Sequence, residues 1–148
     1  MEIKFVVPGD PQGKARARTF YDPRACHSVS KTPENTAMYE NLIKTAYTLK
    51  YKDFQFPEET PLQMEIVAYF RIVKSERKWK RSLMEAGLMR PMKTPDADNI
   101  QKVICDALNK VAYHDDAAIV RATVDKVYTS GPPRVDVTIR EWKGPKDE

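Results

Sequence analysis

The sequence predicts an α+β fold in which a small mixed sheet, including a C-terminal β-hairpin, packs with two to three helices. Runs with strand character stand near both ends of the chain, and segments with the apolar spacing of helices lie between them. Strands and helices that segregate in this way are typical of α+β domains. The chain has 148 residues, near the usual size of one compact domain, so we expect a single domain over residues 1–148.

Four runs have strand character because they are rich in apolar and β-branched side chains: residues 3–7, 62–72, 119–128 and 134–142. In the last run Val135, Val137 and Ile139 alternate with polar residues, which indicates one buried face. Turn-forming residues at 130–133 separate the last two runs. We therefore expect these two runs to pair as the C-terminal hairpin.

Three segments space their apolar residues three and four positions apart, as amphipathic helices do. The first follows residues 32–35 and ends at 51–53, the second covers 75–86, and the third covers roughly 98–111. The third is the clearest, because its apolar residues form one unbroken stripe opposite a polar face of Asp98, Lys102, Asp106 and Asn109. Residues 10–35 carry prolines and glycines without a sustained period, so we expect a long, irregular, functional loop.

The composition suits a globular protein, with 41% hydrophobic and 31% charged residues. The apolar runs are too short to span a bilayer, and residues 1–8 lack the apolar core of a signal peptide, so we expect a cytoplasmic protein without membrane contact. Cys26 and Cys105 show no paired spacing. Together with His27 and His114 they fall short of a recognisable set of four zinc ligands, so we expect neither a disulfide nor a zinc site.

A glycine-containing segment near the N-terminus looks superficially like a phosphate-binding loop. Between Gly9 and Gly13 stand three residues where that motif needs four, and Ala15 follows Lys14 where it needs Ser or Thr. We therefore expect no nucleotide cofactor.

The net charge is +4, and the basic residues are unevenly placed. One cluster is Lys14, Arg16, Arg18 and Arg24, and a second is Lys74, Arg77, Lys78, Lys80 and Arg81. Such clusters suit the phosphate backbone of DNA, although a solvated loop explains the first equally well. Trp79, within the second cluster, is expected to anchor its helix in the core rather than to stack on a base.

Acidic residues flank the third predicted helix: Asp96 and Asp98 at its start, and Asp115 and Asp116 after its end. A helix of this length rises about 20 Å, so helix geometry alone does not bring the two groups together. Either the chain folds back so that Asp116 passes Asp98, or the two groups serve separate purposes.

Two interpretations of these acids follow. In the functional one, Asp96, Asp98 and Asp116 hold a Mg²⁺ ion near a scissile phosphate, and Lys102, one turn after Asp98, contacts a phosphate oxygen. In the structural one, Asp98 and Gln101 form a capping box, Lys102 pairs with acids on its own helix, and the later pair is a turn. The residues alone leave both open.

Three motifs in this region resemble the RusA family of Holliday junction resolvases: PDADNIQK at 95–102, DALN at 106–109, and DD at 115–116 followed by Ile119 and Val120. Members of that family carry a D-x-D-N-x-x-K motif, a D-A-L segment and a later D-D pair in this order. The N-terminal residues 8–18 also look like the basic, proline-containing start of many members. The resemblance covers most of the chain, and its central motif is specific.

The resemblance implies a homodimeric nuclease that makes paired nicks in four-way DNA junctions, with Mg²⁺ as cofactor and Mn²⁺ as a substitute. It implies that Asp96, Asp98 and Asp116 are metal-binding catalytic acids, that Lys102 is a catalytic lysine, and that Asp115 is a further metal ligand.

Two positions qualify the match. Asp106 corresponds to an acid of the family motif, but its place on the helix also allows a structural ion pair with Lys102, so we rank it below the other acids. Several members carry Gln two residues after the D-D pair, where this chain has Ala118. A polar contact from that position is lost here.

We therefore expect a resolvase that acts in DNA recombination and repair. One alternative is a non-catalytic DNA-binding protein of a phage or mobile element, in which the acids only cap and pair. Another is a metal-dependent nuclease for other branched or single-stranded DNA.

Overall fold

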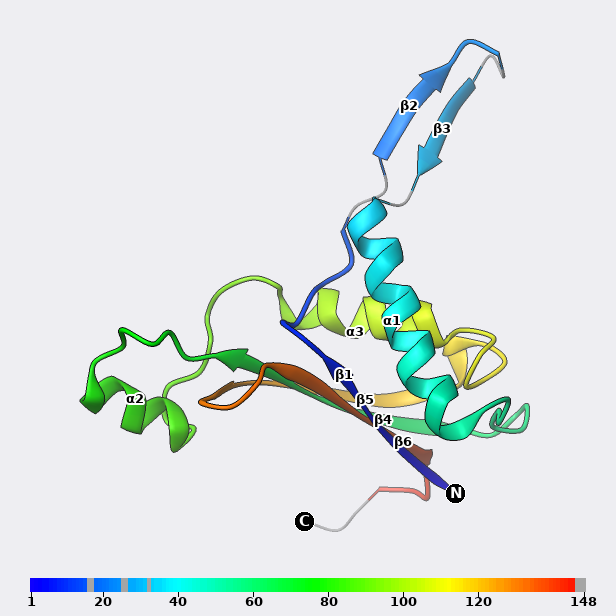
Figure 1. Cartoon of the computed structure of the whole chain (residues 1–148). Helices are drawn as coiled ribbons and strands as arrows, with labels where there is room; N and C mark the ends of the chain where they lie inside the picture. Colours follow the sequence, from blue (N-terminus) through cyan, green and yellow to red (C-terminus); the bar gives the residue numbers. More distant parts are fainter. Residues whose placement is uncertain (16–17, 25–26, 32, 146–148) are drawn as a thin grey trace.

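The computed structural model describes residues 1–15, 18–24, 27–31 and 33–145, with only the backbone described for 18–20, 22 and 27–31. The strands are β1 (Glu2–Pro8), β2 (Arg18–Asp22), β3 (His27–Lys31), β4 (Leu62–Arg71), β5 (Ile119–Thr129) and β6 (Arg134–Glu141). The helices are α1 (Glu34–Tyr51), α2 (Lys78–Glu85), α3 (Ala97–Leu108) and the short 3₁₀ turn η1 (Asp116–Ala118). The predicted α+β class is confirmed, and Figure 1 shows the elements in place.

The main sheet has four strands in the order β1-β6-β4-β5. Strand β4 pairs antiparallel with β6 and parallel with β5, so the sheet is mixed, as predicted. The two C-terminal strands and the turn between them occur where the sequence places them, but β4 lies between β5 and β6. The turn therefore carries the chain across β4 instead of closing a directly paired hairpin. Strand β4 takes this central place because its residues are almost continuously apolar, as suits a strand with a neighbour on each side.

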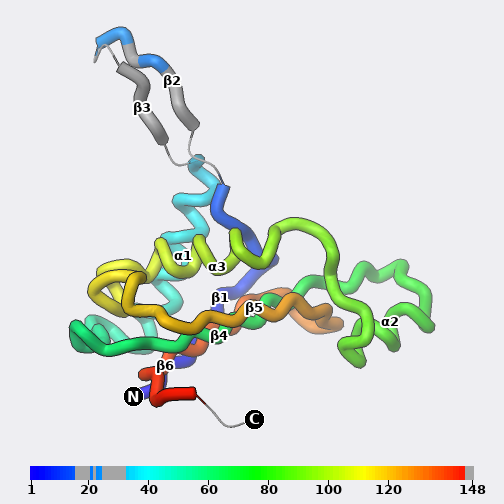
Figure 2. Tube along the Cα trace, turned by 180° about the vertical axis from the view of Figure 1, so that it is seen from behind, coloured from blue at the N-terminus to red at the C-terminus, as the bar shows by residue number. Residues whose placement is uncertain are grey.

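Helices α1 and α3 cover one face of this sheet, and Figures 1 and 2 show both helices on the same side. Strand β1 alternates exposed and fully buried residues, and the buried set continues through β6 and β4. Helix α3 contributes the apolar stripe predicted from its sequence: Ile100, Val103, Ile104, Ala107 and Leu108. Because that stripe is committed to the core, the opposite face of α3 is free for other contacts.

Two projections extend from this core (Figures 1 and 2). Strands β2 and β3 pair antiparallel as a separate two-stranded ribbon, within the segment expected to be an irregular loop. That expectation was wrong for the described backbone, because the two strands are only five residues long and Pro23 and Pro33 close to their ends hid the strand pattern. The second projection contains α2 and stands beyond the ends of β4 and β5. Within the described ranges, no helix combines the length and apolarity needed to cross a membrane.

Candidate active site

A surface hollow of about 520 Å³ lies between the polar face of α3 and the start of β5. Its lining includes one lysine and three carboxylates from the predicted constellation: Asp98, Lys102, Asp106 and Asp116. After α3 ends, the chain turns through η1 and β5 runs back along α3 (Figure 1). This return brings Asp116 to the same hollow as Asp98, although a full helix separates them along the chain.

The turn that returns Asp116 is held by specific contacts. The Tyr113 hydroxyl is buried and donates to the carbonyl oxygen of Cys105 at 2.8 Å, which ties the turn to the last part of α3. The backbone N–H of Asp116 donates to Asn109 Oδ1 at 3.1 Å. Burial raises the pKa of the Cys105 thiol to about 11, so this cysteine is a packing residue and not a nucleophile.

The two adjacent carboxyl groups of the turn influence each other. A hydrogen bond with Asp115, then partial burial, then the negative charges of Asp115 and Asp106 raise the pKa of the Asp116 carboxyl. The backbone N–H of Ala117, followed by the hydrogen bond with Asp116, lowers the pKa of Asp115. Carboxylates that repel in this way create a local negative potential that a cation would relieve.

Helix α3 begins at Ala97, and Asp96 occupies the N-cap position without a side-chain capping bond. Asp98 therefore lies in the first turn and is exposed, so the capping box with Gln101 is not formed. Asp96 and Asp115 do not line the hollow. Within the described part of the chain, no three Asp, Glu, His or Cys side chains already stand as a set of metal ligands. The hollow thus gathers oxygen donors around an open space.

Lys14 was predicted from the sequence to bind DNA, and the structure shows it in contact with two acidic side chains. Its ammonium lies 2.5 Å from Glu40 Oε1 on α1 and 3.3 Å from Asp106 Oδ2 on α3. Only about a fifth of the side chain is exposed. Burial lowers the pKa of Lys14, but hydrogen bonds to Glu40 and Asp106 outweigh it and the net shift is upward. Asp106 thus pairs with Lys14 and not with Lys102, because the N-terminal segment brings Lys14 within reach of an acid on each of the two helices.

The N-terminal segment reaches α3 through a close approach at Gly13. A Cβ atom at this position would lie 2.9 Å from Asn99 Cβ and 3.0 Å from Pro95 Cβ. The next residue donates its backbone N–H to the Asn99 carbonyl at 3.0 Å. Glycine is therefore needed for the N-terminal segment to lie against the start of α3, where Asp98 stands.

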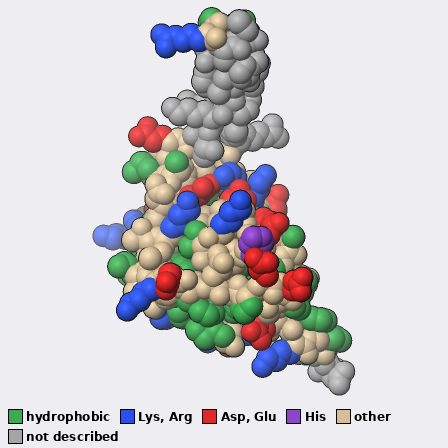
Figure 3. All heavy atoms as spheres, turned by 90° about the vertical axis from the view of Figure 1, so that its right-hand side faces the viewer, with side chains coloured by type: hydrophobic (Ala, Val, Ile, Leu, Met, Phe, Trp, Pro, Cys, Tyr) green, Lys and Arg blue, Asp and Glu red, His purple; other side chains and the backbone are tan. Residues whose placement is uncertain are grey.

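The surface on this side of the molecule carries both charges. Figure 3 shows acidic side chains gathered around a histidine, with lysines and arginines beside them below the projecting ribbon. His114 Nδ1 lies 3.4 Å from Glu58, and both side chains are exposed. Arg121 on β5 also lines the hollow and is exposed. Sequence reasoning missed Arg121, because nothing in the strand pattern of β5 distinguishes it from other outward-facing residues.

The family assignment rests on the whole chain. The sequence model of the family described as Endodeoxyribonuclease RusA matches residues 8–140, which include every residue of the hollow. The chain belongs to the RusA family. This family indicates an endodeoxyribonuclease that acts on branched DNA as a Holliday junction resolvase. "Uncharacterized protein YqaN" of Bacillus subtilis (strain 168) is 34% identical over 145 residues, covering 94% of this chain and 96% of the relative.

Apart from Lys14, the predicted DNA-binding residues of this RusA family member that the structure describes fall on its two projections. Arg16 lies outside the described residues, Arg18 is described only as backbone of β2, and Arg24 is exposed between β2 and β3. The second cluster surrounds α2, where Lys74, Arg77 and Lys78 are exposed and Lys80 and Arg81 are partly exposed. Trp79 is 57% exposed, so the prediction that it anchors α2 in the core was wrong. Helix α2 instead buries Met84.

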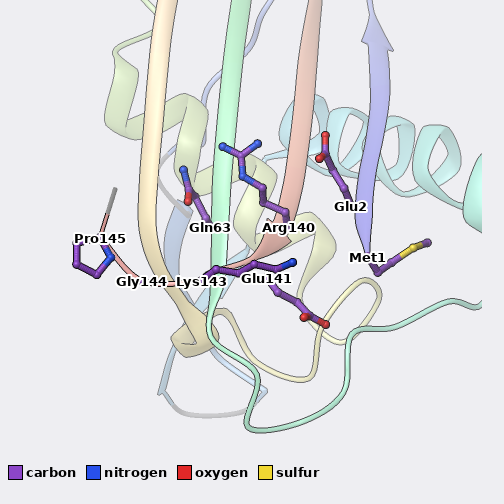
Figure 4. Close-up of a pocket in the computed structure, with 8 residues that line it drawn as sticks. All are labelled: Met1, Glu2, Gln63, Arg140, Glu141, Lys143, Gly144 and Pro145. Carbon is purple, nitrogen blue, oxygen red and sulfur yellow. The ribbon is translucent and has the colours of Figure 1, made fainter. Parts of the chain in front are cut away.

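A different hollow, of about 430 Å³, lies at the end of the sheet near both termini (Figure 4). It is lined by side chains of both charges, including Glu2, Glu141, Arg140 and Lys143. Arg140 donates to Glu65 Oε1 on the neighbouring strand, so its charge is already paired. The family motifs lie elsewhere, which leaves the hollow beside α3 as the candidate active site of this RusA family member.

Proposed function

We propose that this chain is a Mg²⁺-dependent Holliday junction resolvase that acts as a homodimer in DNA recombination and repair. The observation that carries the proposal is the hollow beside α3, which gathers Asp98, Lys102 and Asp116 from the family motifs. Asp106 lines the same hollow and is held there by Lys14.

The donor set fits a hard divalent cation, since Mg²⁺ prefers carboxylate oxygens. Asp98 and Asp116 would hold the ion, with Asp96 and Asp115 next to them in the chain as further metal-binding candidates. The raised pKa of Asp116, caused first by its hydrogen bond with Asp115 and then by burial and nearby acids, indicates the repulsion that a cation offsets. Bound Mg²⁺ would supply Lewis acidity toward the scissile phosphate and its attacking water.

The other side chains of the hollow prepare it for a phosphodiester. Lys102 is exposed one turn after Asp98 on the same face of α3, where its ammonium can neutralise a phosphate oxygen as charge develops. Arg121 faces the same space from β5 and adds a second cation. In this proposal the carboxylates hold and orient the metal ion, and the two cations bind the phosphodiester of the substrate.

A homodimer follows from the substrate. Symmetric incision of a four-way junction needs two related active sites, which a two-fold dimer provides. As a nuclease acting on chromosomal or phage DNA, the protein would work in the cytoplasm.

The test compares cleavage of a synthetic four-way junction by the wild-type chain and by Asp98→Asn in Mg²⁺, and again in Mn²⁺. We expect paired nicks from the wild type and a loss of at least about 100-fold in rate for the variant. Asp53→Asn is the matched control, because Asp53 is an exposed acid of the loop after α1 and does not line the hollow. Equal cutting by all three proteins, or none by the wild type with any divalent metal, contradicts the proposal.

Parallel reactions with other DNA substrates distinguish the resolvase from its alternatives. A flap and a linear duplex of the same sequence are incubated in parallel with the junction. Preference for the flap would make the protein a nuclease for another branched structure, and binding without metal-dependent cutting would make it a non-catalytic DNA-binding protein.

A further inference from the structure

The projection that carries α2 presents an aromatic side chain that the active site does not use. Trp79 lies in the first turn of α2 with 57% of its surface exposed, and Lys80 Nζ lies 5.6 Å from the centre of its ring. Tryptophan is highly buried on average in proteins, so a large exposed indole indicates a contact surface.

This projection is braced, so it holds Trp79 in a defined place. The Arg81 guanidinium donates to the carbonyl oxygen of Val73 at 2.9 Å, which joins α2 to the segment that leads into it. Farther along, Arg90 donates to the carbonyl of Lys126 on β5 at 3.3 Å, and the Lys126 ammonium donates to the Lys93 carbonyl at 2.6 Å. The part of the projection that follows α2 is thus attached to β5.

The charge around Trp79 indicates which partner it meets. Residues 73–81 contain five lysines and arginines and one acid, Glu76. Among the ion pairs of the described residues, none involves this segment. Arg81 braces the projection, and the other four cations of the segment have no carboxylate partner that would compete with a ligand. Lysine is depleted in the cores of protein–protein interfaces, whereas a dense row of cations beside an aromatic ring is typical of nucleic-acid binding.

We infer that Trp79 stacks on the face of a base that is left unstacked at the branch point of the DNA substrate, while the neighbouring cations bind the phosphates on either side. This inference rests on the proposed function and adds a base contact that the active-site residues do not supply. Duplex bases are stacked on both faces, so the indole finds a free face only where stacking is interrupted. Residues 86–95 connect the end of α2 to Asp96 and to the start of α3, so the projection is joined through the chain to the helix that carries Asp98 (Figure 1).

The chain allows a direct optical test, because it has two tryptophans, Trp79 and Trp142. Trp142→Phe leaves Trp79 as the sole indole, and Trp79→Phe leaves Trp142 as the matched control on the distal end of the sheet. Both changes are made in the Asp98→Asn background, so that the DNA stays intact. We expect a four-way junction to quench the Trp79 emission at least about twofold and a linear duplex to leave it nearly unchanged, because stacking on a base quenches indole fluorescence. The Trp142 emission should stay constant with both.

Affinity gives the second readout. Trp79→Ala should bind the junction about tenfold more weakly than the parent, Trp79→Phe should retain most of the affinity, and duplex binding should change less than twofold. Unchanged Trp79 emission with the junction, or equal junction affinity of Trp79→Ala, overturns the inference. So does a Trp79 signal that responds to protein dilution without DNA, since that places Trp79 between two copies of the chain.

Failure of the inference is distinct from failure of the proposed function. If the wild type cuts junctions and Trp79 does not respond, only the base contact is wrong. If the wild type cuts no branched DNA, the proposed function itself is wrong, whatever Trp79 does.

Discussion

Lys14 Nζ lies 3.3 Å from Asp106 Oδ2, which joins the N-terminal segment to the helix that carries the candidate catalytic residues. Both side chains are less than one third exposed, and Glu40 on α1 completes the cluster. We expect Lys14→Gln to lower the free energy of unfolding by about 1–3 kcal/mol, because two partly buried carboxylates lose their partner. Chemical denaturation at neutral pH measures this loss.

A double-mutant cycle identifies the pair that is responsible. If Lys14 acts through Asp106, Lys14→Gln should cost less in the Asp106→Asn background than in the wild type. Lys44→Gln on α1 is the control, and it should change stability by less than about 0.5 kcal/mol, as surface changes usually do. If the two substitutions have additive effects on the free energy of unfolding, the Lys14–Asp106 contact does not contribute to stability.

Gly13 is expected to tolerate no side chain. Gly13→Ala places a Cβ 2.9 Å from Asn99 Cβ and 3.0 Å from Pro95 Cβ, closer than the ordinary carbon–carbon contact of about 3.5–4 Å, which forces the N-terminal segment away from α3. We expect a loss of about 1–3 kcal/mol in stability together with slower cleavage, because Asp98 lies in the same turn as Asn99. The matched control is Gly131→Ala, where the nearest atom to the new Cβ is Thr129 Oγ1 at 3.5 Å. Equal melting temperatures for the two variants would contradict the close approach.

The cations around α2 should appear in the salt dependence of DNA binding. Each phosphate contact contributes about −0.9 to the slope of log K against log salt for duplex DNA. A Lys74→Gln, Lys78→Gln double variant should therefore flatten the slope by about 2. Lys4→Gln with Lys52→Gln, two exposed lysines outside both projections, should leave the slope unchanged. An unchanged slope in the first variant would show that α2 stays off the DNA.

The parts of this molecule that the sequence predicted well are those encoded by local periodicity. The apolar stripe of α3 and the alternation in β6 each follow from a repeat within one segment. The return of Asp116 to Asp98 was left open, because it depends on the buried Tyr113 hydroxyl and the Asn109 side chain holding a turn. Such contacts have no periodic signature.

The features that the sequence did not predict involve pairings between distant segments. The place of β4 between β5 and β6 depends on which strands meet across the sheet, and a turn between consecutive strands does not decide this. The ion pair of Lys14 with Asp106 has the same origin. Trp79 was misplaced for another reason: an amphipathic pattern shows which residues share a face, but not whether the protein covers that face.

Lys102 should affect the chemical step more than DNA binding. Lys102→Ala removes the cation that faces the hollow one turn from Asp98, and removal of one stabilising donor at a reacting group typically costs about 100- to 1,000-fold in rate. Single-turnover cleavage of the junction measures the rate, and binding without divalent metal measures the affinity, which should change less than about tenfold. Lys44→Ala is the control. If affinity and rate fall in parallel, Lys102 only binds DNA.

Asp116→Asn should raise thermal stability at neutral pH while it abolishes cleavage. The hydrogen bond with Asp115, partial burial and the charges of Asp115 and Asp106 raise the pKa of Asp116, so the folded state holds this proton more tightly than the unfolded chain does. A carboxyl of this kind contributes stability below its unfolded pKa, and that contribution is lost as the pH rises through the folded pKa. The ionised group therefore destabilises the fold at pH 7, and the amide removes the repulsion.

Melting curves across pH test the sign of this effect, and Mg²⁺ tests its cause. The advantage of Asp116→Asn over the wild type should shrink as the pH falls below the unfolded pKa, where both side chains are neutral, and Asp53→Asn should show no such trend. Added Mg²⁺ should raise the melting temperature of the wild type more than that of Asp116→Asn, because only the wild type offers the full set of carboxylates. An Asp116→Asn protein that is less stable than the wild type at pH 7 would show that the ionised Asp116 carboxylate does not destabilise the fold. An equal gain of melting temperature from Mg²⁺ would show that Asp116 does not bind the ion.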